Sequence, residues 1–291
     1  MSTGERVCVV VVTRDRRELL RQCLTALEAQ SRPPDHILLV DNASSDGTTD
    51  MVAQEFPGVE TLRSDENVGG AGGFHRGVEA AHAAGYDWLW LLDDDTMAFQ
   101  GTLAELLAGA DRAPGPGRPA LMASHVVWTD GRPHPMNRVG PRWRWLEPLI
   151  EACADGLVLI RYATFVSVLV HRSSIDRCGL PLAHYFIWSD DIEYTGRLLR
   201  DAPGYLVPTS VARHQTAQPY TALESSGDRF YYHVRNTLLM LRGSSWDAFE
   251  RIRYLRLLAS SVAGYLSRNR GPAGLRTVLR GARDGLRHPV T

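Results

Sequence analysis

The N-terminal third of the chain alternates between apolar, mostly β-branched runs and segments whose apolar residues recur at helical spacing. Residues 7–12, VCVVVV, are followed by leucines at helical intervals from Leu19 to Leu27, which predicts a buried strand and then an amphipathic helix. A second strand at Ile37–Val40 leads into another helix, and residues 58–96 contain a third and a fourth strand with a helix between them. Four strands alternating with helices predict an α/β fold with a largely parallel sheet covered on both faces.

The composition excludes several classes of function. A chain of 291 residues with 44% hydrophobic content can bury a full core as one large domain with an appendage. Its net charge of −1 gives no general attraction to nucleic acid, and we expect no nucleic-acid partner. All 32 basic residues are arginines, which excludes a Walker-type phosphate lysine and a Schiff-base or pyridoxal-phosphate lysine.

Cysteine spacing and hydropathy indicate a cytoplasmic protein. The four cysteines show no C-x-x-C spacing, and no signal peptide precedes the first apolar run. The longest apolar stretches are shorter than the roughly 18 to 20 residues that span a bilayer. We therefore expect no transmembrane helix.

Polar residues follow each of the four predicted strands. They stand at residues 13–15, 41–42, 65–67 and 93–95. Any one of these groups alone is typical of a turn or a helix cap. Because the carboxyl ends of parallel strands meet at one edge of a sheet, where ligands bind, the four together favour a ligand site.

Three consecutive carboxylates, Asp93 to Asp95, end the fourth predicted strand in the segment WLLDDDT. Each repels its neighbours, so the group is either a solvated turn or a cation site. In extended backbone residues i and i+2 point the same way, which predicts that Asp93 and Asp95 share one cation while Asp94 faces aside. Oxygen ligands of this kind suit Mg²⁺ or Mn²⁺.

The second half of the chain is less regular. Residues 113–119 are a Pro/Gly-rich loop, and residues 129–148 have no usable period and are rich in Arg, Trp and Pro, which is typical of a binding loop or a lid. Strands are predicted within 156–170. Helices are predicted from Ser173, from near Ser189 and in DRFYYHVRNTLLMLRG, whereas GYLVPTSVARHQT is either two short strands or one broken strand.

Several segments together resemble the inverting glycosyltransferases of family 2, over about residues 5–240. They are VVVVTRDRRELL, ILLVDNASSDGT, NVGGAGGFHRGV, WLLDDDT and WSDDIEYTGRL. NVGGAGGFHRG and YYHVRN are most similar to the branch that contains galactofuranosyl- and rhamnosyltransferases. The resemblance implies a GT-A fold, a Rossmann-like nucleotide-sugar-binding sheet flanked by helices. Residues 1–243 would form the catalytic domain, with a nucleotide-sugar half at about 1–125 and an acceptor half at about 126–243, followed by a basic helical extension at 244–291.

The resemblance also implies the reaction and its residues. A sugar, with UDP-galactofuranose or dTDP-rhamnose as donor, would move to an acceptor hydroxyl on a glycan, a lipid-linked sugar or a small molecule, by metal-assisted direct displacement. His214 would join Asp93 and Asp95 at Mn²⁺ or Mg²⁺, and Asp191 would be the general base. The implied acceptor contacts are Trp188, Asp190 and Glu193. The implied donor contacts are Thr13, Arg14, Asp41, Asn67, Gly70, Arg76, Asp94 and Arg235, although Arg235 and Asn236 either hold the pyrophosphate or pin their helix.

Two other functions use similar features. A sugar-1-phosphate nucleotidyltransferase also places carboxylates and metal on an α/β sheet, but it needs a glycine-rich basic loop where VVVVTRDRREL has no glycine. A non-catalytic sugar- or nucleotide-binding module needs no second carboxylate pair such as Asp190 and Asp191. An NAD enzyme is disfavoured because His75 occupies the place of the third glycine of the dinucleotide fingerprint.

The C-terminal segment 251–291 carries nine arginines against one aspartate. Apolar residues from Tyr254 to Leu266 recur in it at helical spacing. A basic amphipathic pair of helices can lie on an anionic membrane surface, here the inner face of the membrane. The alternatives are packing on the catalytic domain and formation of a homo-oligomer.

Overall fold

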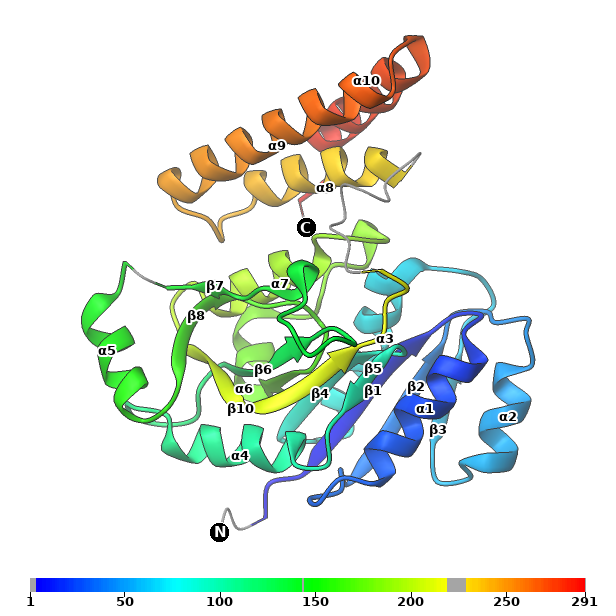
Figure 1. The fold of residues 1–291 in the computed structure, drawn as a ribbon, viewed down its shortest axis with the longest axis vertical. Helices are drawn as coiled ribbons and strands as arrows, with labels where there is room; N and C mark the ends of the chain where they lie inside the picture. Colours follow the sequence, from blue (N-terminus) through cyan, green and yellow to red (C-terminus); the bar gives the residue numbers. More distant parts are fainter. Residues whose placement is uncertain (1–3, 143, 219–228, 291) are drawn as a thin grey trace.

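The computed structural model describes residues 4–142, 144–218 and 229–290. Ten strands form a mixed sheet in the order β3-β2-β1-β4-β9-β6-β10-β8-β7, with β5 paired to β10 (Figure 1). The strands are β1 (Val7–Thr13), β2 (His36–Asp41), β3 (Glu60–Arg63), β4 (Trp88–Asp93), β5 (Thr96–Ala98), β6 (Leu121–Val127), β7 (Gly140–Pro141), β8 (Val158–Tyr162), β9 (Val168–His171) and β10 (Gly204–His214).

The first four strands form a parallel half-sheet, as the alternating pattern predicts. β1 lies between β2 and β4, and β3 pairs with β2, all in parallel. The helices α1 (Arg17–Glu28), α2 (Thr48–Glu55) and α3 (Gly69–Ala83) connect them. The register pairs Thr13 with Asp41 and Val12 with Asp93, so the polar residues after these strands do meet at one edge.

The rest of the sheet is mostly antiparallel, and the expectation of a largely parallel sheet is wrong there. β9 runs antiparallel to both β4 and β6, and β8 runs antiparallel to β10. The segment GYLVPTSVARHQT contains one strand, β10, whose register with β6 shifts between Val207 and Val211. Pro208 lies in this irregularity, and proline has no N–H to donate to a ladder.

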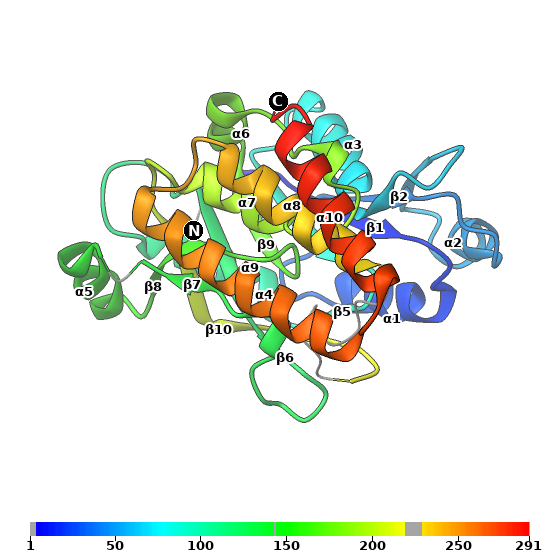
Figure 2. The ribbon, with the colours of Figure 1, turned by 90° about the horizontal axis from the view of Figure 1, so that it is seen from above.

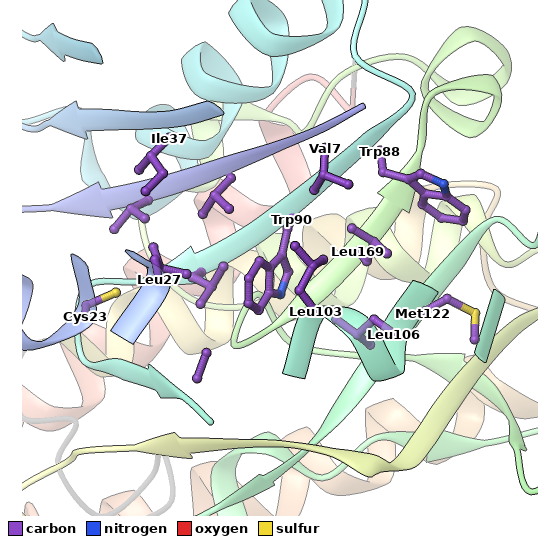
Figure 3. Close-up of a cluster of buried hydrophobic side chains, with 14 of the residues drawn as sticks. Val7, Cys23, Leu27, Ile37, Trp88, Trp90, Leu103, Leu106, Met122 and Leu169 are labelled. Carbon is purple, nitrogen blue, oxygen red and sulfur yellow. The ribbon is translucent and has the colours of Figure 1, made fainter. Parts of the chain in front are cut away.

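Two apolar layers cover the two faces of the sheet, as predicted. Side chains of α1, α2 and α4 (Thr102–Arg112) pack on one face, and those of α3, α6 (Arg172–Cys178) and α7 (Asp190–Leu198) pack on the other. Figure 3 shows the first layer, in which Trp90 is fully buried and donates its indole N–H to Ser167 Oγ at 3.0 Å. This donation leaves the ring free to pack without a buried unpaired donor.

The segment 129–148 holds short elements only. They are the 3₁₀ turn η1 (Pro135–Asn137), β7 and the start of α5 (Leu146–Ala154). Residue 143 lies outside the described residues. A second 3₁₀ turn, η2 (Ala183–Tyr185), precedes α7.

Three C-terminal helices form a layer above the end of the sheet (Figures 1 and 2). They are α8 (Phe230–Arg242), α9 (Ala248–Arg268) and α10 (Pro272–Arg287). Glycines let α10 approach α8 closely, because a Cβ at Gly285 would lie 2.5 Å from the carbonyl oxygen of Arg235. The helical extension that the sequence predicts is therefore present, and its helices α9 and α10 pack on α8. In the described part of the chain, no helix has the length and hydropathy to cross a bilayer.

Candidate active site

A cavity of about 580 Å³ opens at the carboxyl ends of β1 and β4. Its walls come from segments far apart in the chain, including the loop before α7 and the first turn of α8. Eleven of the residues singled out in the sequence line it: Thr13, Arg14, Asn67, Gly70, Asp93, Asp94, Asp95, Trp188, Asp190, Asp191 and His214. The remaining four, Asp41, Arg76, Glu193 and Arg235, do not.

Asp93, Asp95 and His214 form one cluster in this cavity. One ligand atom from each lies within 4.8 Å of the others. Asp93 ends β4, and His214 is brought to it because β5 pairs with β10 in a register that places Thr96 opposite His214. The premise of extended backbone is wrong, since Asp94 and Asp95 form a turn between β4 and β5. The turn nevertheless sets Asp93 and Asp95 together.

The hydrogen bonds around His214 fit a metal ligand. Its Nδ1 lies 2.7 Å from Asn137 Oδ1, and the Nδ2 of Asn137 donates to Thr164 Oγ1 at 3.0 Å. An amide oxygen only accepts, so Nδ1 is the donor here, and with a cation bound His214 would present the lone pair of Nε2 to it. Nε2 lies 3.0 Å from Asp95 Oδ1, a buried oxygen with no hydrogen bond. A cation between them would satisfy both atoms.

The pKa shifts of the three aspartates also fit a cation site. Burial, together with the charges of Asp95 and Asp94, raises the pKa of Asp93 well above its usual range. Burial also raises the pKa of Asp94 to about 6, against the opposing attraction of Arg16. Burial acts in the same sense on Asp95, but His214 and Arg16 outweigh it and hold its pKa below the usual value. A divalent cation would relieve this repulsion, because it favours the charged forms of its carboxylate ligands.

Arg16 lines the cavity and is not among the residues expected there from the sequence. Its Nη1 donates to Asp95 Oδ2 at 2.6 Å and to Asp94 Oδ1 at 3.1 Å. Thr13 Oγ1 donates to the other oxygen of Asp94 at 2.7 Å. Asp94 is thus held by Thr13 and Arg16, apart from the cluster. The only sequence signal was an arginine in the loop after the first strand, and two others stand beside it in TRDRRE.

The side chain of Asp41 makes hydrogen bonds within the protein and does not face the cavity. It is fully buried, and its oxygens accept from the backbone N of Ser44 at 2.9 Å and from Thr49 Oγ1 at 2.8 Å. The cavity is lined instead by the next residue, Asn42, whose Nδ2 donates to Asn67 Oδ1 at 3.1 Å. Arg76 donates to Ser64 Oγ at 2.5 Å and lies outside the cavity.

The glycine run of NVGGAGG serves packing as well as the cavity. A Cβ at Gly73 would lie 2.4 Å from Val12, so this glycine lets α3 pack closely on β1. Gly69 has φ +73°, and a Cβ there would lie 2.0 Å from the carbonyl oxygen of Phe186. Gly69 and Gly70 line the cavity, so only the start of the run faces it.

The loop before α7 is strained and is held by α8. Phe186, Trp188 and Ser189 all have positive φ, at 65°, 67° and 65°, which non-glycine residues rarely adopt. Asn236 is fully buried and its Nδ2 donates to three carbonyls of this loop, those of Tyr185, Ile187 and Trp188. The surrounding helix therefore imposes the conformation that starts α7.

Arg235 shares this role of holding the loop. Its Nη2 donates to the carbonyl oxygens of His184 and Tyr185, at 2.7 and 2.8 Å. Of the two expected roles of Arg235 and Asn236, these contacts correspond to pinning the chain rather than to holding a pyrophosphate. Arg229 and Tyr232, in the first turn of α8, line the cavity in their place.

Asp190 and Asp191 open α7 at the cavity wall. Burial, and then the charge of Asp190, raises the pKa of Asp191 to about 8, and burial raises that of Asp190 to about 6. The charge of Asp191 also contributes to the raised pKa of Asp93, so the two carboxylate groups face a common space. Glu193 points elsewhere and pairs with Arg197 at 2.9 Å.

Comparison with known proteins decides the family. The sequence profile of glycosyl transferase family 2 matches residues 8–117. The galactofuranosyltransferase GlfT1 of Mycolicibacterium smegmatis is 33% identical over 204 residues, which cover 69% of this chain and 67% of the relative. The chain belongs to glycosyltransferase family 2.

Further relatives of this family 2 glycosyltransferase agree. The N-acetylglucosaminyl-diphospho-decaprenol L-rhamnosyltransferase of Mycobacterium tuberculosis is 26% identical over 268 residues, covering 82% of this chain and 85% of the relative. Both relatives belong to the branch that the motifs indicated. Membership of family 2 sets aside the nucleotidyltransferase alternative.

Solved structures confirm the GT-A fold. S. aureus TarS superposes with a TM-score of 0.67 at 13% identity, over 98% of this chain and 49% of the TarS chain. Its 1–349 fragment in complex with UDP-GlcNAc superposes with a TM-score of 0.66 at 12% identity, over 97% of this chain and 80% of the fragment. The chain thus spans about half the length of full TarS. At these identities the likeness establishes the fold alone.

Proposed function

We propose that this family 2 enzyme transfers a sugar from a nucleotide-diphosphate sugar to an acceptor hydroxyl, with inversion and with help from a divalent cation. The observation that carries the proposal is the arrangement of two carboxylate groups around one cavity. The cluster of Asp93, Asp95 and His214 lines this cavity, and so does the separate pair of Asp190 and Asp191. A direct displacement needs both, because attack and departure take place on opposite faces of the sugar.

Asp93, Asp95 and His214 would hold Mn²⁺ or Mg²⁺, and the mixture of oxygen and imidazole ligands favours Mn²⁺. When bound, the cation neutralises charge on the leaving diphosphate. Arg14 and Asn67 line the same cavity and would orient the donor together with Thr13. Arg16 is half exposed and, beside Asp94 and Asp95, can also reach donor phosphate oxygens.

Asp191 would act as the general base. It takes the proton of the acceptor hydroxyl as that oxygen bonds to the anomeric carbon and the bond from that carbon to the diphosphate breaks. Attack opposite the leaving group inverts the anomeric configuration. Trp188 and Asp190 line the cavity next to Asp191 and would position the acceptor sugar, by stacking and by hydrogen bonding.

The donor we propose is UDP-galactofuranose or dTDP-rhamnose. The support is the names of the relatives, a galactofuranosyltransferase and an L-rhamnosyltransferase. The second relative acts on a sugar carried by diphospho-decaprenol, which supports a lipid-linked acceptor here. Such an acceptor places the enzyme at the cytoplasmic face of a membrane.

The C-terminal helices support a peripheral membrane contact. Their exposed apolar side chains include Leu257, Leu275, Leu279 and Leu286, which are 48 to 58% exposed. These leucines stand among the nine arginines of segment 251–291, a combination that suits an anionic surface.

A thermal-shift panel of UDP, dTDP and GDP sugars, with and without Mn²⁺, tests the donor assignment. A ligand at 100 times its dissociation constant adds about 2.7 kcal/mol to the free energy of unfolding. We expect a metal-dependent shift with one nucleotide only, followed by transfer to an acceptor glycoside with inverted product. A shift without metal, or a product of retained configuration, would contradict the proposal.

A further inference from the structure

A second cavity, of about 410 Å³, lies where the catalytic domain meets the start of α9. We name it the extension pocket; β7, β8, the segment leading into α5, and residues 244–254 line it. It shares no residue with the cavity that holds Asp191. The family motifs include none of its α9 residues.

The extension pocket is strongly cationic. Five arginines line it against two acids, Asp247 and Glu250. Arg144 pairs with Asp247 at 2.7 Å and Arg161 pairs with Glu250 at 2.8 Å. Three arginines are left without a strong carboxylate partner in the pocket: Arg142, Arg200 and Arg253. An anion is the ligand that this excess of charge would favour.

These three arginines differ in how they are held. Arg142 is buried and donates only to backbone carbonyls at the end of α7, those of Leu199, Arg200 and Ala202. Burial, and then Arg161, lowers its pKa to about 10, against the opposing attraction of Glu250 and Asp201. Arg253 is exposed and makes no hydrogen bond or ion pair with any residue that the structure describes. Arg200 reaches only the exposed Asp201, at 3.6 Å.

The rim of the pocket is apolar and exposed. Trp145 and Phe249 line the pocket, with 40% and 51% of their surfaces exposed. Leu146, Ile150 and Ile252 are close to them in the chain and are 62, 60 and 51% exposed. A cationic cavity with an apolar rim matches an amphiphile with an anionic head and a hydrocarbon tail.

The pocket is built on the helix that carries the proposed base. The carbonyl of Gly196 accepts from Arg161 Nη1, and a Cβ at Gly196 would lie 2.6 Å from the ring of Trp246. Both Arg161 and Trp246 line the pocket. Gly196 is six residues beyond Asp190, roughly 9 Å along the axis of α7. The extension pocket and the acceptor side of the active site therefore lie toward opposite ends of α7.

We propose that the extension pocket binds the diphosphate of a lipid-linked acceptor, with Arg200 and Arg253 as phosphate contacts and the lipid chain over Trp145 and Phe249. This rests on the proposed lipid-linked acceptor. The acceptor would be held at two points, its sugar near Asp191 and its diphosphate at the far end of α7. The extension would then select acceptors by the group that carries the sugar.

The test compares two double variants of equal charge in the full chain. Arg200→Gln with Arg253→Gln changes the pocket, whereas Arg112→Gln with Arg132→Gln removes two exposed arginines that lie outside both the pocket and segment 251–291. With a prenyl-diphosphate-linked sugar, we expect the pocket variant to raise the acceptor KM about tenfold or more, with kcat and donor KM unchanged. The control variant should keep the acceptor KM within about twofold, because it leaves the pocket intact.

Direct binding separates this inference from the reaction itself. Farnesyl diphosphate should bind the intact protein and the control variant with similar affinity. Its affinity for the pocket variant should be at least about tenfold lower. Farnesol, which has no diphosphate, should bind none of the three proteins. Equal weakening in both double variants would assign the effect to general surface charge and overturn the inference. So would an unchanged KM in the pocket variant with transfer intact, which leaves the proposed function standing. If no transfer is found with any acceptor, farnesyl diphosphate binding still decides the pocket.

Discussion

The Nδ2 atom of Asn236, in α8, lies 2.8 Å from the carbonyl oxygen of Trp188, in the loop that begins the helix of Asp190 and Asp191. The same amide also holds the carbonyls of Tyr185 and Ile187. An element of the C-terminal layer thus fixes the backbone from which the proposed base projects. The catalytic geometry depends on both halves of the chain.

Asn236→Ala should lower kcat more than it weakens donor binding. It removes the donor that holds a strained loop and leaves the carbonyls of Ile187 and Trp188 to find other partners, at a cost of about 1 to 3 kcal/mol in the free energy of unfolding. Arg242→Gln is the matched control, because Arg242 is also on α8 and also donates to backbone carbonyls, but to those of Gly285 and His288. Steady-state kinetics and chemical denaturation of both variants measure the difference. An equal loss of kcat in both would mean that α8 acts only through global stability.

Asp93→Asn and Asp95→Asn should abolish transfer and remove the metal-dependent part of donor binding, whereas Asp94→Asn should affect metal affinity less. The reason is that Asp94 is held by Thr13 and Arg16, outside the cluster. Titration calorimetry of donor with and without Mn²⁺ measures this. Full activity of the first two variants in chelator would rule out the metal site.

Asn137→Leu tests the same metal site by removing the hydrogen bond between Asn137 and Nδ1 of His214. Loss of the acceptor at Nδ1 frees His214 to change tautomer, so Mn²⁺ affinity should fall about 10- to 100-fold while metal-free nucleotide binding persists. Unchanged Mn²⁺ affinity would show that the hydrogen bond from His214 to Asn137 does not support a metal site.

Asp191→Asn should bind donor and metal nearly normally and transfer at least about a hundredfold more slowly, the usual cost of losing a general base. Asp190→Asn is the neighbouring control. If Asp190→Asn shows this loss while Asp191→Asn transfers normally, the base is assigned to the wrong aspartate. Single-turnover rates with saturating donor measure the chemical step.

The rate should rise with pH through the titration of Asp191. Burial and Asp190 raise its pKa to about 8, and a base must be unprotonated to accept the acceptor's proton, so activity is lost as pH falls below that value. Asp190→Asn removes the like charge and should move the profile to lower pH. The stability effect has the opposite sign: because the folded pKa is raised, folding is favoured less as pH rises from the unfolded value toward about 8. A profile that is flat from pH 6 to 9 would contradict the assignment.

Much of the fold followed from local pattern, whereas the site required contacts between distant segments. The strands β1, β2 and β4 and the helix α1 were predictable because their periodicity is local. The position of β9 between β4 and β6 was not, since nothing in its own residues specifies antiparallel partners. His214 reaches Asp95 only through the register of β5 with β10, so the family resemblance, rather than any pattern in the chain, pointed to it.

Residues that act through backbone carbonyls were also beyond sequence reasoning. Arg235 had two open roles, because an arginine can hold a pyrophosphate or a loop, and only the contacts of its guanidinium with the chain distinguish them. Asn137 gave no signal, since its role depends on the His214 and Thr164 side chains on either side of it. The packing role of Gly73 also gave no signal, since it depends on Val12 of a different strand.

The dependence of the loop before α7 on Asn236 affects how the chain folds during its synthesis. Synthesis runs from the N-terminus, so the nucleotide-sugar half and Asp191 leave the ribosome before α8 does. Until α8 docks, nothing in the described chain supplies the amide that holds the carbonyls of residues 185, 187 and 188. A chain that lacks α8 would therefore carry Asp191, the proposed base, after a loop without this support.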